Sequence, residues 1–236
     1  FLAQKAASEP VVLCKMPATI SSFDSEGYVV IENILSDEAI VEIEKQLMFL
    51  PNGGAGTRNL LNEKWCKHLS QSVAMHPLIS VLLPKSAVAV QCTYFRKSLE
   101  RNWLVPLHKD YVIPRKERFS ADDWSMWSVK EGVHYARPPD KVLETMVAVR
   151  FHLESNTVKN GPLQVVPRSH RSCSLSGTRT ECIVNKGGAL AMRPLILHAS
   201  SKIIEGQRRV LHFLYGSAQL PNPAEWANAV QLIEKY

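Results

Sequence analysis

The chain is poor in the residues and patterns that build fibrous, disordered or membrane-spanning proteins. Only 11 glycines and 14 prolines occur among 236 residues, too few for a chain dominated by linkers. No apolar run approaches the roughly 20 residues of a membrane span. Residues 1–12 also lack the basic and apolar segments of a signal peptide. We therefore expect a globular protein without a membrane partner, with enough chain for one sizeable core.

Cysteines are few, and they show no metal-binding or disulfide pattern. The five are odd in number, widely spaced and never arranged as Cys-x-x-Cys. This favours reduced thiols in a cytoplasmic enzyme. The net charge of +6 comes from Lys and Arg that are interleaved with acidic residues. We therefore expect no nucleic-acid partner, and favour a solvated surface, or a pocket for an anionic small molecule, over a basic DNA-binding stripe.

Helical patterns come first and strand patterns follow. Residues 1–20 show no periodicity and are expected to form an irregular arm, and residues 27–35 form a short strand. Ser36, followed by two acidic residues, is a typical helix N-cap. A helix is predicted after it, ended by the turn at 51–54, with further helices over 60–73 and 77–83. Short strands are then predicted at 87–95, 105–113, 145–153, 163–167, 181–184, 189–192, 195–198 and 209–215.

This order excludes a βαβ fold and predicts an α+β protein. We expect a single domain over residues 1–236, with a helical part at about 20–84 and a core at about 85–217. The core is predicted to be a double-stranded β-helix, or jelly roll, buttressed by the N-terminal helices. Residues 111–144 are long for a loop, and we expect them to form a substrate lid carrying Trp124, Trp127 and Tyr135. The alternative is that these aromatic residues only pack the segment onto the outer sheet.

Two His-x-acid pairs are candidates for a metal site. His108 and Asp110 lie on one predicted strand, where residues two apart share a face. His152 and Glu154 show the same spacing, and either pair alone is a weak signal. His198 ends a later apolar strand, and a histidine there is more often structural than a ligand.

Taken together, these residues could bind a metal ion and a co-substrate. Two histidines and one carboxylate on one face of Fe(II) leave open positions for a bidentate co-substrate and O2. An arginine at the mouth of the next strand, Arg208 or Arg209, can bind the far carboxylate of that co-substrate. The alternatives are a metal-free jelly roll that binds a ligand or partner, and a cupin-type metalloenzyme that does not use 2-oxoglutarate.

Three stretches, together with residues 23–36, make a specific resemblance to one family. They are VPLHKD at 105–110, NGPLQVVPRSH at 160–170, and HAS at 198–200 with RRVLHF at 208–213. In these segments the chain resembles the phytanoyl-CoA dioxygenase family of Fe(II)- and 2-oxoglutarate-dependent oxygenases. The resemblance runs from about residue 23 to about residue 215.

The resemblance implies a role for each matching residue. His108, Asp110 and His198 correspond to the iron ligands, which are also the catalytic centre. Arg208 corresponds to the arginine that binds the distal carboxylate of 2-oxoglutarate, with Arg209 as the alternative. Ser200 corresponds to a hydroxyl that contacts the same carboxylate. His152 and Glu154 then match no ligand pair.

The implied reaction uses Fe(II), 2-oxoglutarate and O2, releases succinate and CO2, and oxidises a C–H bond of a small molecule, with hydroxylation the expected outcome. Halogenation is disfavoured because family-like halogenases lack the carboxylate found here at Asp110. Two residues depart from the family pattern: Lys109 replaces a commoner Gln, and Arg168 replaces a usual Gly. His170 matches a turn position and is expected to be structural. The basic residues Lys109, Arg115, Lys116 and Arg118 indicate either an anionic substrate or a solvated strand end.

Overall fold

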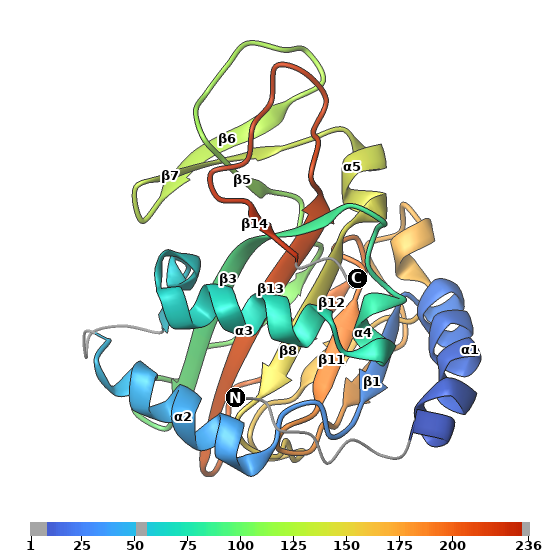
Figure 1. Ribbon diagram of the computed structural model, residues 1–236, viewed down its shortest axis with the longest axis vertical. Helices are drawn as coiled ribbons and strands as arrows, with labels where there is room; N and C mark the ends of the chain where they lie inside the picture. The colour runs from blue at the N-terminus through green and yellow to red at the C-terminus, as the bar shows by residue number, and fades with distance from the viewer. Residues whose placement is uncertain (1–8, 51–55, 233–236) are drawn as a thin grey trace.

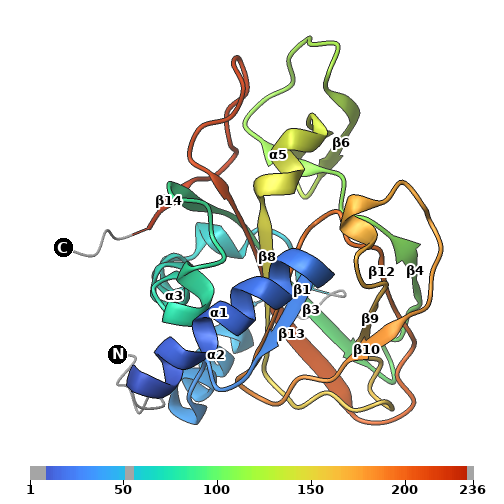
Figure 2. The ribbon, with the colours of Figure 1, turned by 90° about the vertical axis from the view of Figure 1, so that its right-hand side faces the viewer.

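Three layers of secondary structure build the molecule. The structure is a computed structural model that describes residues 9–50 and 56–232. A layer of helices covers one face of a large antiparallel sheet, and a smaller sheet faces its other side (Figures 1 and 2). No helix among the described residues is long and apolar enough to cross a membrane.

The helical layer comes from the first third of the chain. It consists of α1 (Glu9–Glu26), α2 (Asp37–Met48), α3 (Lys64–Ala74) and α4 (Pro77–Ser80), with a 3-10 turn, η1, at Leu60–Asn62. The predicted N-cap of α2 is confirmed, since the Ser36 side chain accepts a hydrogen bond from the backbone N–H of Ala39. The prediction of an irregular arm over residues 1–20 is wrong from Glu9 onward, where α1 begins. The predicted turn at 51–54 lies outside the described residues.

The large sheet has the strand order β1-β11-β8-β13-β3-β14, with β2 also pairing β3. Its strands are β1 (Tyr28–Ile31), β2 (Gly56–Thr57), β3 (Ala87–Ser98), β8 (Val147–His152), β11 (Ala189–Met192), β13 (Gln207–Ser217) and β14 (Val230–Gln231). The facing sheet has the order β10-β9-β12-β4. It is built from β4 (Val105–His108), β9 (Leu163–Val165), β10 (Thr180–Cys182) and β12 (His198–Ser200).

This pair of antiparallel sheets confirms the predicted jelly roll and α+β class. Alternation along β8 shows how the sequence positions the two faces. Val147, Val149 and Phe151 belong to the apolar cluster shared with the helices. Arg150 and His152 alternate with them, so they face the smaller sheet, as the period of two along a strand requires. Buried polar side chains therefore point into the space between the two sheets, where they can contact a bound ligand.

Residues 111–144 form a folded unit rather than an open loop. Three strands, β5 (Ile113–Arg115), β6 (Ser125–Lys130) and β7 (Val133–Arg137), pair in the order β5-β7-β6, and α5 (Asp140–Thr145) follows. A tight turn at Glu131 and Gly132, both at positive φ, joins β6 to β7. This small sheet lies beyond one end of the two facing sheets, at the top of Figures 1 and 2. The segment therefore lies at the end of the jelly roll. It contains strands and a helix that its amino-acid composition did not predict.

Candidate metal and co-substrate site

Two strands of the smaller sheet bring three candidate ligands together. His108 is the last residue of β4, His198 is the first residue of β12, and the two are direct cross-strand partners. Asp110 follows β4 by two residues, and its backbone N–H donates to the carbonyl of Pro194 at 2.9 Å. One ligand atom from each of the three side chains lies within 4.8 Å of the others. The two-residue spacing and the strand pairing thus place the three groups around one point.

Hydrogen bonds orient both imidazole rings toward that point. The Nδ1–H of His108 donates to the carbonyl of Pro106 at 2.8 Å, and that of His198 donates to the carbonyl of Ile196 at 3.0 Å. Each Nε2 atom then faces Asp110, at 3.5 Å from Oδ1 for His108 and 3.6 Å from Oδ2 for His198. A backbone acceptor on the far nitrogen is the usual way in which proteins fix a metal-binding histidine. This donor set of two nitrogens and a carboxylate suits Fe(II) and leaves open positions.

Electrostatics keep the carboxylate charged. Burial by itself would raise the pKa of Asp110, but His198, His108 and His212 outweigh it and hold the pKa well below its usual range. Burial lowers the pKa of His198, and the hydrogen bond with Asp110 raises the pKa of His108. A charged carboxylate and a neutral buried imidazole are the protonation states that a divalent metal requires.

The two consecutive arginines of β13 point to opposite faces of the large sheet. Arg208 is buried on the cavity side, where its Nη1 donates to the carbonyl of Gly161 and its Nε has no hydrogen-bond partner. Arg209 lies on the helical side, where it forms ion pairs with Glu154 and with Glu44 of α2. Of these two arginines, Arg208 therefore lies on the cavity side with an unpartnered donor, and Arg209 does not.

Ser200 also faces the cavity, beside a lysine that the sequence did not single out. Its Oγ accepts a hydrogen bond from the buried Nζ of Lys97 at 2.9 Å. Lys97 pairs with Arg208 across β3 and β13, so these cationic side chains are neighbours. Burial, reinforced by Arg208 and Arg150, lowers the pKa of Lys97 to about 7.

The second His-x-acid pair does not form a ligand cluster. The Nδ1–H of buried His152 donates to Asn156 at 2.9 Å, and burial lowers its pKa to about 3. Glu154 forms its ion pair with Arg209 on the other side of the sheet. The two side chains of this pair therefore serve different parts of the structure.

A cavity of about 410 Å³ connects the triad to Arg208. The described lining residues are Arg58, Gln91, Thr93, Phe95, Trp103, Val105, His108, Lys109, Asp110, Tyr111, Val112, Ile113, Met126, Lys130, Tyr135, Arg150, Leu163, Pro194, His198, Ser200, Arg208, His212 and Leu214. Tyr135 reaches it from the small sheet, and its hydroxyl donates to Gln91 at 3.1 Å. Trp124 and Trp127 do not line it. Trp124 is buried beside Phe119 and Arg115 instead, so its predicted substrate contact is wrong.

Of the four basic residues that the sequence suggested as substrate contacts, Lys109 lines the cavity, whereas Arg115, Lys116 and Arg118 do not. The Nζ of Lys109 donates to the carbonyls of Ser169 and Ser172, and Lys116 forms an ion pair with Glu225. The lining also includes Arg58, Lys130 and Arg150. Each is a single charge far from the triad in sequence. One signal was present, because Arg150 interrupts an otherwise apolar strand at 147–151.

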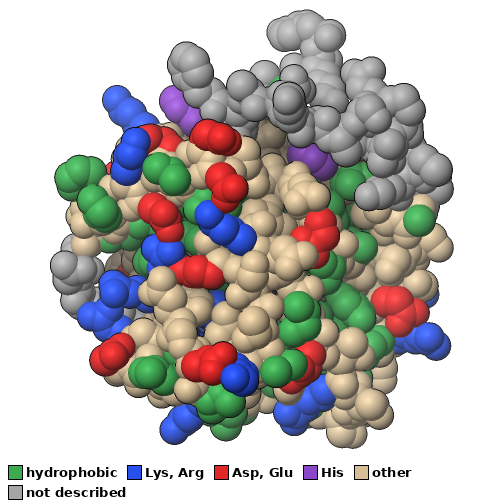
Figure 3. Space-filling view, turned by 90° about the horizontal axis from the view of Figure 1, so that it is seen from below, with side chains coloured by type: hydrophobic (Ala, Val, Ile, Leu, Met, Phe, Trp, Pro, Cys, Tyr) green, Lys and Arg blue, Asp and Glu red, His purple; other side chains and the backbone are tan. Residues whose placement is uncertain are grey.

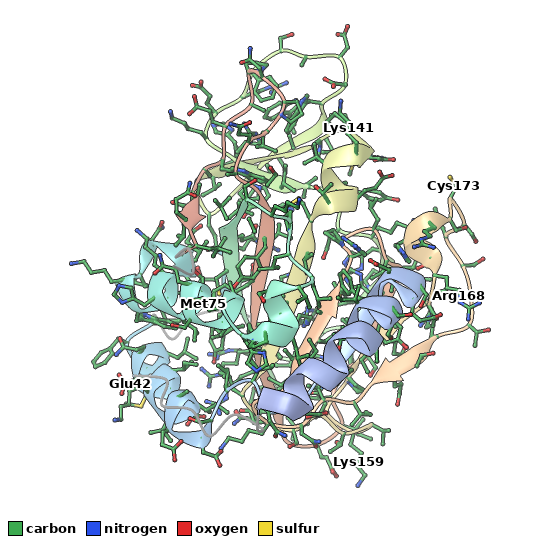
Figure 4. The ribbon with its side chains drawn as sticks, turned by 45° about the vertical axis from the view of Figure 1, so that its right-hand side comes forward. Glu42, Met75, Lys141, Lys159, Arg168 and Cys173 are labelled. Atoms are coloured by element: carbon green, nitrogen blue, oxygen red, sulfur yellow. The ribbon has the colours of Figure 1, made fainter. Side chains whose placement is uncertain are left out.

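The turn at 167–171 has a supporting role. Arg168 adopts φ 65°, which explains why glycine is usual at that position. Its Nε donates to Glu26 at the end of α1, and Figure 4 shows Arg168 beside that helix. His170 packs against Gly27, where any side chain would collide with the ring. His170 is not among the residues that line the cavity, and its structural role stays a prediction.

Comparison with known proteins identifies the family of the chain. Residues 23–210 match the phytanoyl-CoA dioxygenase family. No curated protein sequence matches the chain significantly.

Solved structures of similar fold share little sequence with this chain. The epimerase SnoN from nogalamycin biosynthesis, described as non-heme and α-ketoglutarate-dependent, has 13% identity and a TM-score of 0.67, covering 94% of this chain and 97% of its own. The carbocyclase SnoK from the same biosynthesis has 12% identity and a TM-score of 0.63, covering 89% and 85%. HygX from Streptomyces hygroscopicus, solved with nickel and 2-oxoglutarate, has 16% identity and a TM-score of 0.60, covering 85% and 86%.

Proposed function

Because the chain belongs to the phytanoyl-CoA dioxygenase family, we propose that His108, Asp110 and His198 bind the Fe(II) of a 2-oxoglutarate-dependent dioxygenase. The enzyme class follows from family membership, and the residue roles are our proposal. The observation that carries them is the pair of Nε2 atoms, each held by a backbone acceptor and aimed at Asp110. Bound Fe(II) would supply the oxidising chemistry, with release of succinate and CO2.

We assign Arg208 to the distal carboxylate of 2-oxoglutarate. Its guanidinium is buried and faces the cavity, and its Nε has no partner among the described residues. Ser200 lies on the opposite sheet and lines the same cavity. A buried cation with a free donor suits a carboxylate, because a charge-assisted hydrogen bond is strong there. Arg209 has its own carboxylate partners, which supports Arg208 over Arg209 for this role.

The reaction oxidises a C–H bond of a small molecule, and we propose that this substrate is anionic. Arg58 and Lys130 line the cavity, and neither forms an ion pair with a described residue. On the face seen in Figure 3, basic and acidic side chains are interspersed. A cytoplasmic location stays a proposal, supported by the free thiols of Cys66, Cys92 and Cys182.

The activity is tested by anaerobic loading with Fe(II), followed by 2-oxoglutarate and oxygen, with paired anionic and neutral candidate substrates. We expect succinate to form when both 2-oxoglutarate and oxygen are added to the Fe(II)-loaded protein. With an anionic candidate substrate, we expect mass spectrometry to detect an oxidised product. Lys130→Met should raise the KM for that candidate, whereas Lys116→Met, which alters an exposed ion pair, should not. Equal turnover of the neutral partners would contradict the anionic assignment.

A further inference from the structure

The cavity holds more buried positive charge than the proposed arginine alone explains. Arg150 and Arg208 both line the cavity and are buried, at 6% and 4% exposure, and buried Lys97 lies beside Arg208 as its cross-strand partner. Among the described residues that line the cavity, Asp110 is the only acidic one. Burying unpaired cations is costly, so a site of this kind is built for an anion that arrives from solution.

Arg150 is the cation whose position is not yet accounted for. It lies in the middle of β8, paired across the sheet with Leu190 on one side and His212 on the other. Its Nη1 donates to Nδ1 of His212 at 3.3 Å, and its guanidinium lies over the Phe95 ring, 5.4 Å from the centroid. Its Nε is buried and has no hydrogen-bond partner. His212 and Phe95 thus fix the side chain while a donor is left free.

The strand register separates Arg150 from Arg208 along the cavity. Arg150 is level with His212, and Arg208 lies four residues farther along β13, which is about 13 Å of strand. Asp110 is close enough to Arg150 to affect its pKa, which burial lowers to about 10. Arg150 therefore lies nearer the proposed metal end of the cavity, and Arg208 marks the other end.

A guanidinium beside a divalent metal is repelled unless an anion lies between them. Asp110 already has two imidazole partners. Resting on the proposed function, we infer that Arg150 is a second co-substrate-binding residue, which binds the metal-end carboxylate of 2-oxoglutarate. Arg208 then binds the distal carboxylate, and His212 is a positioning residue for Arg150.

Two 2-oxo acids separate these roles in a binding experiment. 2-Oxopentanoate keeps the metal-end carboxylate and the keto group of 2-oxoglutarate but lacks the distal carboxylate. Dissociation constants for both acids are measured by calorimetry on the Mn(II)-loaded protein. Arg150→Met should weaken both acids by the same factor, roughly 30-fold or more, because a buried charge-assisted pair is lost. Arg208→Met should weaken 2-oxoglutarate alone.

Further measurements separate binding from folding. Mn(II) affinity should be unchanged in Arg150→Met, and Arg150→Lys should recover part of the affinity for both acids. Without ligand, Arg150→Met should melt at a higher temperature than the parent, because an unpaired buried charge has been replaced by an apolar side chain. A structural role for Arg150 predicts a lower melting temperature instead.

The inference is overturned if Arg150→Met leaves both dissociation constants unchanged, or if it weakens only 2-oxoglutarate. The second result would place Arg150 at the distal carboxylate. Failure of the parent protein to bind either acid would instead contradict the proposed function, so the two failures are distinguishable.

Discussion

At the scale of single residues, Asp110 matters most because it lies between two Nε2 atoms. Asp110→Ala should reduce Mn(II) affinity by more than about 100-fold, since a ligand is lost rather than one of the outer partners that change affinity 10–100-fold. The measurement is titration of free Mn(II) by electron paramagnetic resonance, with folding checked by circular dichroism.

The matched control is His152→Ala, which removes the histidine of the other His-x-acid pair. His152 bonds Asn156 and does not line the cavity, so metal affinity should stay close to that of the parent. If His152→Ala lost the metal and Asp110→Ala kept it, our choice of His108 and Asp110 as the ligand pair would be wrong.

Arg208 and Arg209 are adjacent but lie on opposite faces of the large sheet, so we expect one substitution to affect ligand binding and the other to affect stability. Arg208→Ala should raise the dissociation constant for 2-oxoglutarate roughly 30-fold or more and have a smaller effect on folding. Arg209→Ala breaks ion pairs with Glu44 and Glu154 that are only partly exposed, and should lower the free energy of unfolding by about 2 kcal/mol. Urea denaturation and calorimetry test the two effects. Similar small changes from both variants would refute the assignment.

At the scale of elements, the small sheet is held by an aromatic cluster rather than by a substrate. Trp124 packs edge-on against Phe119, with ring centroids 5.1 Å apart, and Arg115 lies over its ring. Trp124→Ala should lower the free energy of unfolding by about 3–5 kcal/mol. It should also speed tryptic cleavage at the exposed Lys116 and Arg118, while leaving 2-oxoglutarate affinity unchanged. Unchanged cleavage would show that the cluster does not hold this sheet.

Elements with strong local signals could be predicted, and those that depend on distant partners could not. The Ser36 cap and the apolar period of α2 are local, and the structure confirms both. The hairpin of β6 and β7 was missed although Gly132 in a two-residue turn favours one. The strand expected at 195–198 is instead β12 at 198–200, because Ile196 is held in a turn by its bond to the carbonyl of Arg193.

The candidate site divides in the same way. His108 and Asp110 were candidates because two residues apart on a strand is a local pattern, but His152 and Glu154 show the same pattern, and the family resemblance was needed to choose between the pairs. Arg58, Lys130 and Arg150 reach the cavity from different strands or loops, and only the tertiary fold brings them to it. A charged residue inside an apolar strand, as at Arg150, is the signal that could have found one of them.

At the scale of the whole molecule, buried neutral histidines should make stability depend on pH. Burial lowers the pKa of His152 and of His212 to about 3, whereas unfolding restores an ordinary value near 6.5. The unfolded chain therefore binds protons that the folded protein excludes. Stability should be fully present above about pH 6.5 and fall as the pH drops toward 3, by about 1.4 kcal/mol per pH unit for each histidine.

Urea unfolding midpoints measured between pH 7 and pH 4 test this expectation. The His152→Gln variant supplies the control, because it removes one titrating group and should reduce the slope. An identical slope in parent and variant would show that His152 does not titrate on unfolding.

The pairing of His108 with His198 has a consequence for how the edge of the smaller sheet moves. β4 is the edge strand, and its register with β12 shifts between His198 and Ser200. A metal bound by residues of both strands would cross-link β4 to β12 and suppress local opening of this edge. Backbone amides of β4 should therefore exchange with deuterium slowly when Mn(II) is present and quickly when it is removed, while those of β8 and β13 exchange slowly in both states.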